Sequence, residues 1–207
     1  PHSSLSHMMG VLTRFLGAPD EAFLIGTSGT INYDALARFA NQNEPRILFG
    51  TALAFLNLIE QNESIPALPP GSWLFETGGY KGTGRTLEKT EFYQQLEQNF
   101  AVPADHIINE YAMTELSSQF YTSGLHHPHR APHWLRARVI NPATNTEVAD
   151  GESGVLHITD LANLGSCLAV ATRDLAVRRG TDFELTGRDP DALPRGCSRT
   201  ADELLNS

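Results

Sequence analysis

The chain has 207 residues, of which 41% are hydrophobic and 19% charged, a composition typical of folded globular proteins rather than disordered ones. Its formal net charge is −9 and no block of lysine or arginine stands out, which argues against nucleic acid or an anionic membrane as a partner. No apolar run reaches the roughly 18 residues that span a bilayer, and the sequence shows no secretory leader, so we expect a cytoplasmic protein without a membrane span.

The two cysteines, Cys167 and Cys197, are far apart and do not suggest a disulfide scaffold, which agrees with a reducing compartment. The first six residues (PHSSLS) resemble the interior of a loop that leads into a helix. We therefore expect the chain to be part of a longer protein.

Short apolar segments alternate with helical periodicity over the first half of the chain. Helices are predicted over residues 5–17, over 33–42 with Asn32 as cap, after a cap at Thr51, and over 87–100. Buried strands are predicted over residues 22–26, 46–50, 73–77 and 107–111. This alternation predicts an α/β fold with a parallel sheet flanked by helices.

The pattern changes near residue 136. Short strands are predicted over residues 136–140, 154–158 and 183–186, with turn signals at Asn141-Pro142, Asp150-Gly151 and Arg179-Gly180. We expect an α/β sheet subdomain over residues 1–135, followed by a smaller β-rich subdomain over residues 136–207.

Two polar segments follow predicted strands, residues 76–82 (ETGGYKG) and 109–115 (NEYAMTE). In parallel sheets, ligands bind beyond the carboxyl ends of the strands. Glycine lets the backbone approach a ligand closely, an aromatic ring stacks on a base, a hydroxyl bonds a phosphate, and a carboxylate holds Mg²⁺. The residues of these types are Gly78, Gly79, Tyr111, Thr114 and Glu115. Taken singly, each is also typical of an ordinary turn, cap or packing position.

Residues 109–115 resemble the Y-G-x-T-E motif of the acyl-adenylate-forming superfamily. The resemblance implies that Tyr111 stacks on adenine, Thr114 contacts the α-phosphate and Glu115 binds Mg²⁺. Ala112 stands where the family usually has glycine.

Two further segments resemble motifs of the same superfamily in the same order. Residues 171–175 (ATRDL) resemble its T-G-D motif, which implies that Asp174 binds the ribose hydroxyls, although Arg173 replaces the glycine. Residues 185–189 (LTGRD) resemble its G-R-x-D hinge motif, which implies that Arg188 also reaches the ribose.

Within the superfamily, the chain most resembles the LuxE-type acyl-protein synthetases over nearly its whole length. The segments that carry this likeness are residues 76–82, 109–120, 187–189 and 195–198. The resemblance implies ATP and Mg²⁺ as cofactors, a fatty or other carboxylic acid as substrate, and an acyl reductase or acyl carrier as a partner.

It also implies that Cys197 receives the acyl group from AMP, the alternative being a thiol without a catalytic role. Flanking arginines would favour its thiolate, the reactive form. Two other functions stay open: an acyl-CoA ligase-type adenylase, and a non-catalytic nucleotide-binding relative.

Several remaining residues have competing interpretations. Core packing is favoured for Cys167. Lys81 is either a phosphate contact or a solvated loop residue, and Trp134 either lines an acyl pocket or belongs to the core. The histidines between residues 126 and 133 lack an i, i+4 pair, so a polar loop near a substrate entrance is favoured over a metal site.

The superfamily also has a loop rich in glycine, serine and threonine that ends in lysine and holds the outer phosphates of ATP. Residues 26–30 (GTSGT) have part of this composition but lack the following glycine and lysine. They are interpreted as a connection between a strand and a helix. We therefore expect the phosphate-binding loop to lie upstream, and the chain alone to bind AMP poorly and to be inactive in adenylation.

Overall fold

The computed structural model describes residues 4–16, 23–26, 30–61, 64–79 and 87–190. Their contacts divide them into two compact units. The α/β unit comprises the described residues of Pro1–Asn109 together with Ser123–Leu125, and the β unit comprises Glu110–Thr122 with the described residues of His126–Pro194. The division into subdomains over residues 1–135 and 136–207 stays a prediction.

The helices of the α/β unit begin and end close to the predicted bounds: α1 Ser4–Phe15, α2 Tyr33–Ala40, α3 Ala52–Gln61 and α4 Lys89–Phe100. A short 3-10 helix, Ala104–His106, follows α4. Both predicted caps are confirmed. The Asn32 side chain accepts a hydrogen bond from the Ala35 amide at 2.9 Å, and Thr51 Oγ1 accepts one from the Ala54 amide at 3.0 Å.

The four strands of the first sheet are β1 Ile47–Thr51, β2 Trp73–Thr77, β3 Ile107–Tyr111 and β4 Phe120–Ser123, in that spatial order. β1 and β2 pair in parallel, with Leu48 opposite Leu74. The amide of Gly124, just after β4, donates to the carbonyl of Ile107 at the start of β3, so these two strands are antiparallel. The predicted α/β class is confirmed, but the sheet is mixed rather than purely parallel.

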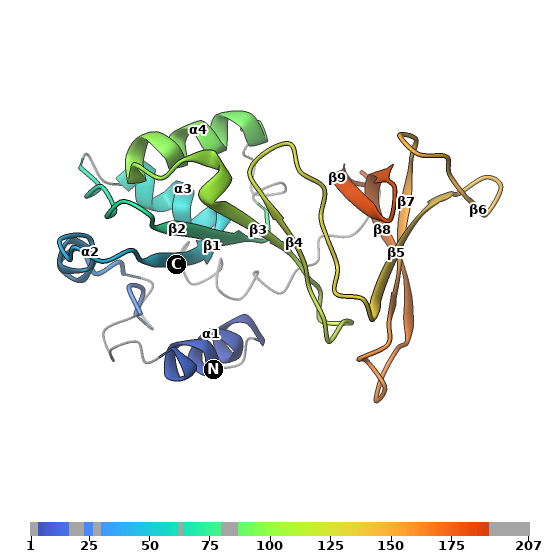
Figure 1. The fold of residues 1–207 in the computed structure, drawn as a ribbon, viewed down its shortest axis with the longest axis horizontal. Helices are drawn as coiled ribbons and strands as arrows, with labels where there is room; N and C mark the ends of the chain where they lie inside the picture. Colours follow the sequence, from blue (N-terminus) through green and yellow to red (C-terminus); the bar gives the residue numbers. More distant parts are fainter. Residues whose placement is uncertain (1–3, 17–22, 27–29, 62–63, 80–86, 191–207) are drawn as a thin grey trace. The chain divides into compact units, whose positions relative to one another are not determined.

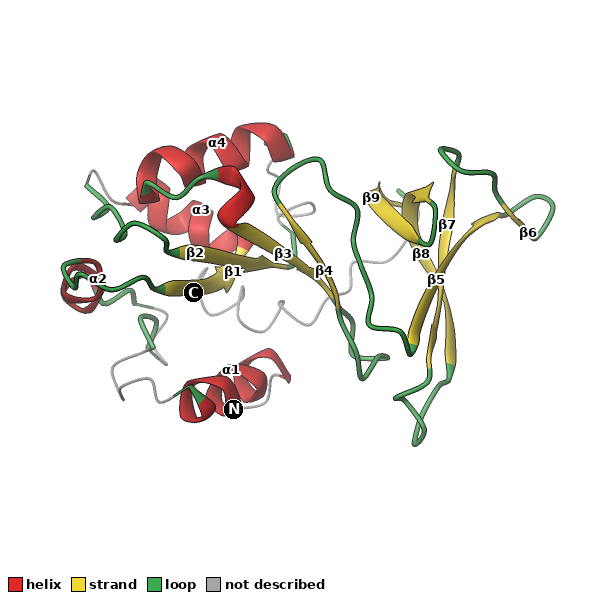
Figure 2. Ribbon diagram, viewed as in Figure 1, coloured by secondary structure: helices red, strands yellow, loops and turns green. Residues whose placement is uncertain are grey.

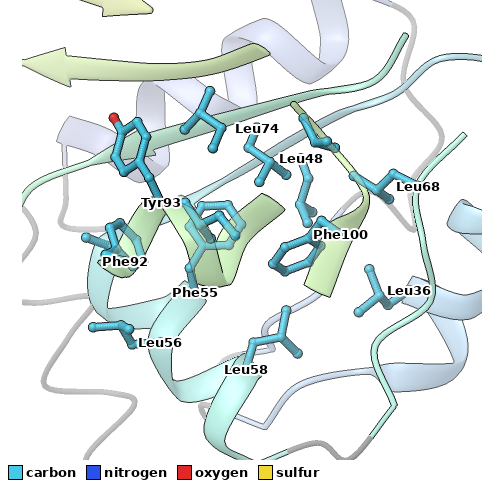
Figure 3. Close-up of a cluster of buried hydrophobic side chains, with 14 of the residues drawn as sticks. Leu36, Leu48, Phe55, Leu56, Leu58, Leu68, Leu74, Phe92, Tyr93 and Phe100 are labelled. Carbon is cyan, nitrogen blue, oxygen red and sulfur yellow. The ribbon is translucent and has the colours of Figure 1, made fainter. Parts of the chain in front are cut away.

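The core of the α/β unit forms where α3 and α4 cover one side of the sheet, as Figure 2 shows. Figure 3 shows its largest apolar side chains, which include Phe55 and Leu56 from α3 and Phe92, Tyr93 and Phe100 from α4. The Phe55 and Phe100 rings meet edge to face at 5.6 Å. This packing holds β2 and the start of β3 in place.

One predicted strand of this unit is wrong. Residues 23–26 form only an isolated antiparallel bridge between Ile25 and Ile31, and Phe23 is 55% exposed. An apolar run of five residues has no strand periodicity of its own, so only its neighbours can make it a strand.

The second sheet lies in the β unit and is antiparallel, in the order β6-β5-β7-β8-β9. Its strands are β5 Leu135–Asn141, β6 Thr146–Glu147, β7 Ser153–Asp160, β8 Ala169–Arg179 and β9 Asp182–Arg188. The predicted strands at 136–140, 154–158 and 183–186 are confirmed, whereas β4, β6 and β8 were not predicted. Its core contains Phe120, Val139, Leu156, Ile158 and Phe183. None of the described helices is long and apolar enough to cross a membrane.

Candidate functional site

Three residues of the predicted nucleotide site lie together in the β unit. The Tyr111 hydroxyl donates to Asp174 Oδ2 at 2.6 Å, and Arg188 Nε lies 3.7 Å from Asp174 Oδ1. Tyr111 comes from the end of β3, Asp174 from the middle of β8 and Arg188 from the end of β9. Asp174 and Arg188 follow Tyr111 by 63 and 77 positions, and the fold brings Tyr111 and Arg188 to the Asp174 carboxylate.

The pairing of β8 with β9 explains why Asp174 and Arg188 meet. Asp174 is opposite Arg188, and Leu175 is opposite Gly187. The next pair is Ala176 with Leu185, so Thr186 is an extra residue in β9 and forms a β-bulge. Gly187 has φ +150°, a conformation that strains other residues, so the glycine of the G-R motif serves the bulge that places Arg188.

The Tyr111 ring lies among other aromatic side chains of the same unit. Its centroid is 5.7 Å from that of Phe183, 6.0 Å from that of Phe120 and 6.2 Å from that of His129. Burial, and then the negative charge of Asp174, raise the pKa of the Tyr111 phenol well above its usual value. The hydroxyl therefore keeps its proton and stays a hydrogen-bond donor to Asp174.

Thr114 and Glu115 lie on the loop that follows β3, within a turn that the Leu116 amide closes by donating to the Met113 carbonyl at 3.1 Å. Both side chains are exposed. Mg²⁺ is usually held by one or two carboxylates together with substrate phosphates, and the accessible Glu115 carboxylate fits that kind of site.

Gly78 and Gly79 follow β2 in the α/β unit. Gly78 has φ +75°, and a Cβ added at Gly79 would have no atom of the described residues within 4 Å. Just before them, the buried Glu76 carboxylate accepts hydrogen bonds from Tyr93 and Asn109, at 3.1 and 2.6 Å.

Cys197 and Lys81, together with residues 27–29 of the GTSGT segment, lie outside the described residues. Their predicted roles stay predictions.

Core packing, the favoured interpretation of Cys167, is wrong, because the residue is exposed on the connection between β7 and β8. Trp134 is 41% exposed, which excludes the core alternative. His129 is only 3% exposed and its ring stacks on Phe183 at 5.2 Å, so this histidine belongs to the aromatic core and not to a polar loop.

Sequence reasoning missed two residues that bond the Glu115 loop, Asp160 and Asn163. The Asp160 carboxylate accepts from the amides of Ser117 and Ser118, and Asn163 Nδ2 donates to the Glu115 carbonyl. Their signal was an aspartate and an asparagine at the end of a strand, a pattern that also marks any turn. The separation of more than 40 residues from their partners leaves no local trace.

The chain is similar in sequence to one known protein family and to two ligases. A family model described as acyl-protein synthetase, LuxE, matches residues 28–205. A long-chain-fatty-acid–luciferin-component ligase from Aliivibrio fischeri is 28% identical over 119 residues, which cover 56% of this chain and 30% of the relative. The enzyme of the same name from Vibrio harveyi is 24% identical over 144 residues, covering 65% of this chain and 38% of the relative. The chain thus spans about a third of the length of these relatives.

Among solved structures, ATP-bound MatB from Rhodopseudomonas palustris is similar with a TM-score of 0.56 and 16% sequence identity, over 77% of this chain and 33% of that one. Identity this low shows a likeness of fold. Because the family model covers most of the sequence, the chain belongs to the LuxE acyl-protein synthetase family.

Proposed function

We propose that the protein activates a fatty or other carboxylic acid with ATP and transfers the acyl group to a thiol. The observation that carries this proposal is the cluster of Tyr111, Asp174 and Arg188, because three residues of separate family motifs meet at one carboxylate. Membership of the LuxE family supports a ligase, and the names of the two relatives support a long-chain fatty acid as the substrate class. The bound ATP of the structurally similar MatB supports ATP as the nucleotide.

In the proposed reaction, a carboxylate oxygen of the acid attacks the α-phosphorus of ATP. A new oxygen–phosphorus bond forms, the bond to the β-phosphate oxygen breaks, and pyrophosphate leaves. The thiolate sulfur then attacks the acyl carbon, the bond from that carbon to the AMP oxygen breaks, and AMP leaves. The thiol proton passes to solvent as the thiolate forms.

Each residue has a proposed part in holding the adenylate. Tyr111 stacks on adenine, and Asp174 and Arg188 bond the ribose hydroxyls. A carboxylate oxygen offers about two acceptor positions, so Asp174 can accept from a ribose hydroxyl while it keeps the hydrogen bond from Tyr111. Gly78 and Gly79 of the α/β unit are proposed nucleotide-binding residues because their backbone is exposed.

Thr114 contacts the α-phosphate and Glu115 holds Mg²⁺. The ion would neutralise negative charge that develops on the phosphate oxygens. Cys197 is the proposed acyl acceptor, and a reductase or an acyl carrier is the proposed next recipient.

The test uses the protein in its complete natural form, with labelled fatty acid and ATP. We expect ATP–pyrophosphate exchange that depends on the acid, and labelled protein that loses its label when treated with hydroxylamine. The Cys197→Ser variant should retain exchange and lose the label. Cys167→Ser is the matched control, because Cys167 is an exposed free cysteine, and its label should persist.

The outcomes separate the alternatives. No exchange with any carboxylic acid would refute acyl activation, and AMP binding without turnover would then support a non-catalytic relative. A labelled coenzyme A thioester without labelled protein would favour the acyl-CoA ligase alternative. Persistent label on the Cys197→Ser protein would exclude Cys197 as acceptor.

A further inference from the structure

The loop that carries Thr114 and Glu115 has little regular structure of its own. Residues 112–119 lie between β3 and β4, and within them the Leu116 amide donates a backbone hydrogen bond to the Met113 carbonyl. Side chains that point to a phosphate or an ion must be held to a fraction of an ångström to act on it. Met113 and Leu116 of the loop pack against the apolar core of the β unit, and polar side chains elsewhere in the unit bond the main chain of the loop.

Asp160, the last residue of β7, supplies the first set of bonds. Its side chain is fully buried, with 0% exposure. Oδ2 accepts from the amides of Ser117 and Ser118, each at 2.9 Å, and Oδ1 accepts from Ser118 Oγ at 3.0 Å and from the Ala162 amide at 3.0 Å. Trp134 Nε1 donates to the same Ser118 hydroxyl at 2.9 Å. A buried carboxylate that accepts from four donors fixes the backbone at residues 117 and 118.

Asn163 supplies the second set and reaches Glu115 itself. Its Nδ2 donates to the Glu115 carbonyl at 2.7 Å and to the Cys167 carbonyl at 2.8 Å. Its Oδ1 accepts from Ser117 Oγ at 3.0 Å. The main-chain amide of Asn163 donates to the main-chain carbonyl of Asp160 at 3.1 Å. The two buried residues are therefore linked to each other as well as to the loop.

The arrangement is asymmetric across the loop. Asp160 and Asn163 are buried and bond its main chain, whereas the side chains of Thr114 and Glu115 are exposed. These bonds thus fix the main chain at Glu115 and leave its carboxylate accessible to solvent. A pair that served only to fill the core would not need to bond the main chain of the residue with the accessible carboxylate.

We infer that Asp160 and Asn163 are positioning residues that set Glu115 for the metal–nucleotide complex. This inference rests on the proposed function. Neither side chain touches the reactants, and both act through the main chain of the loop. Partners that orient a metal ligand typically change metal affinity or activity by about 10-fold to 100-fold when removed, which sets the expected size of the effect.

The test measures ATP–pyrophosphate exchange of the complete natural protein as a function of Mg²⁺ concentration. Asn163→Ala should raise the Mg²⁺ concentration for half-maximal exchange about 10-fold, with the KM for the fatty acid unchanged. Asn163→Asp is the second variant, in case the alanine protein does not fold. It keeps the volume and the acceptor for Ser117 but cannot donate to the Glu115 carbonyl as a carboxylate, so the same rise is expected.

Asn141→Ala is the matched control. Asn141 makes a local bond to the Ala143 amide at 2.9 Å at an exposed turn, and its loss should leave the Mg²⁺ dependence unchanged. If both Asn163 variants lower only the maximal rate and keep the wild-type Mg²⁺ dependence, the residue is merely structural and the inference is overturned, while the proposed function stands. If the wild-type protein shows no exchange, the proposed function fails and the inference fails with it.

Discussion

Glu76 of the α/β unit and Asp160 of the β unit are both buried carboxylates, and their hydrogen-bond partners differ in kind. Glu76 of the α/β unit is 2% exposed and accepts hydrogen bonds from the side chains of Tyr93 and Asn109. Asp160 of the β unit is 0% exposed and accepts from three main-chain amides and one hydroxyl. One carboxylate joins side chains, and the other holds a stretch of main chain.

The difference follows from what already orders the partners. Tyr93 lies on α4 and Asn109 on β3, elements that the apolar core of Figure 3 and the sheet hold in place. Ser117 and Ser118 lie in a loop that is neither helix nor strand, and its contacts with the apolar core come from Met113 and Leu116. A buried carboxylate between a packed helix and strand stabilises an arrangement that the packing already fixes. A buried carboxylate beside a loop helps to fix the course of the loop's main chain.

The largest expected effect tests the Asp160 side of this comparison. Asp160→Ala leaves the amides of Ser117 and Ser118 buried or half-buried without their acceptor, so the free energy of unfolding of the β unit should fall by about 3 kcal/mol. Denaturant unfolding followed by circular dichroism measures the loss. Amide hydrogen exchange should quicken at these two residues first.

Asp150→Ala is the matched control, because Asp150 also accepts a main-chain bond, from the Gly180 amide at 2.6 Å, but at an exposed turn. Its cost should be about 0.5 kcal/mol. Equal losses for the two variants would show that burial of Asp160 does not matter.

A smaller effect is expected at Glu76. Glu76→Gln keeps an oxygen that accepts from Tyr93 and Asn109, and replaces the second carboxylate oxygen by an amide group. We expect a loss of about 1 kcal/mol in the unfolding of the α/β unit, with amide exchange in β2 and β3 unchanged in pattern. The exposed Glu88→Gln is the control and should be neutral. A loss as large as that of Asp160→Ala would break the distinction between the two carboxylates.

The smallest effect concerns a polar group that is only half-buried. Burial, and then the charge of Glu110, raise the pKa of Tyr121 to about 12. The phenol of an unfolded chain has a pKa of about 10, so between about pH 10 and 12 the unfolded state ionises first. The raised pKa of Tyr121 therefore contributes fully to the stability of the folded state below about pH 10, and this contribution is lost as the pH rises to about 12.

Because the side chain is 38% exposed, solvent screens the charge and the contribution should be small. Ultraviolet absorbance of tyrosinate, compared between the wild-type and Tyr121→Phe proteins, measures the pKa directly. An absorbance difference that titrates near pH 10 would contradict the raised pKa of Tyr121. Large effects of polar side chains on stability would then be limited to fully buried groups.

Much of the fold was predictable because its signals are local. Asn32 and Thr51 cap helices through atoms three residues away, so the helix starts could be recognised. The strand predicted over residues 22–26 is wrong because an apolar run this short becomes a strand only when neighbouring strands pair with it. The long strand β8 was not predicted, although Asp174 within it was identified by motif resemblance.

The α/β class, the helix caps and the residue types of the candidate site follow from the amino-acid sequence alone, since they depend on periodicity and on short motifs. The three-dimensional structure was needed to show that Tyr111 donates to Asp174, that a bulge at Gly187 places Arg188, and that Cys167 is exposed. It was also needed to show that Asp160 and Asn163 bond the Glu115 loop. Hydrogen bonds between residues more than 40 positions apart depend on how strands pair and what becomes buried, and neither leaves a mark within a short stretch of sequence.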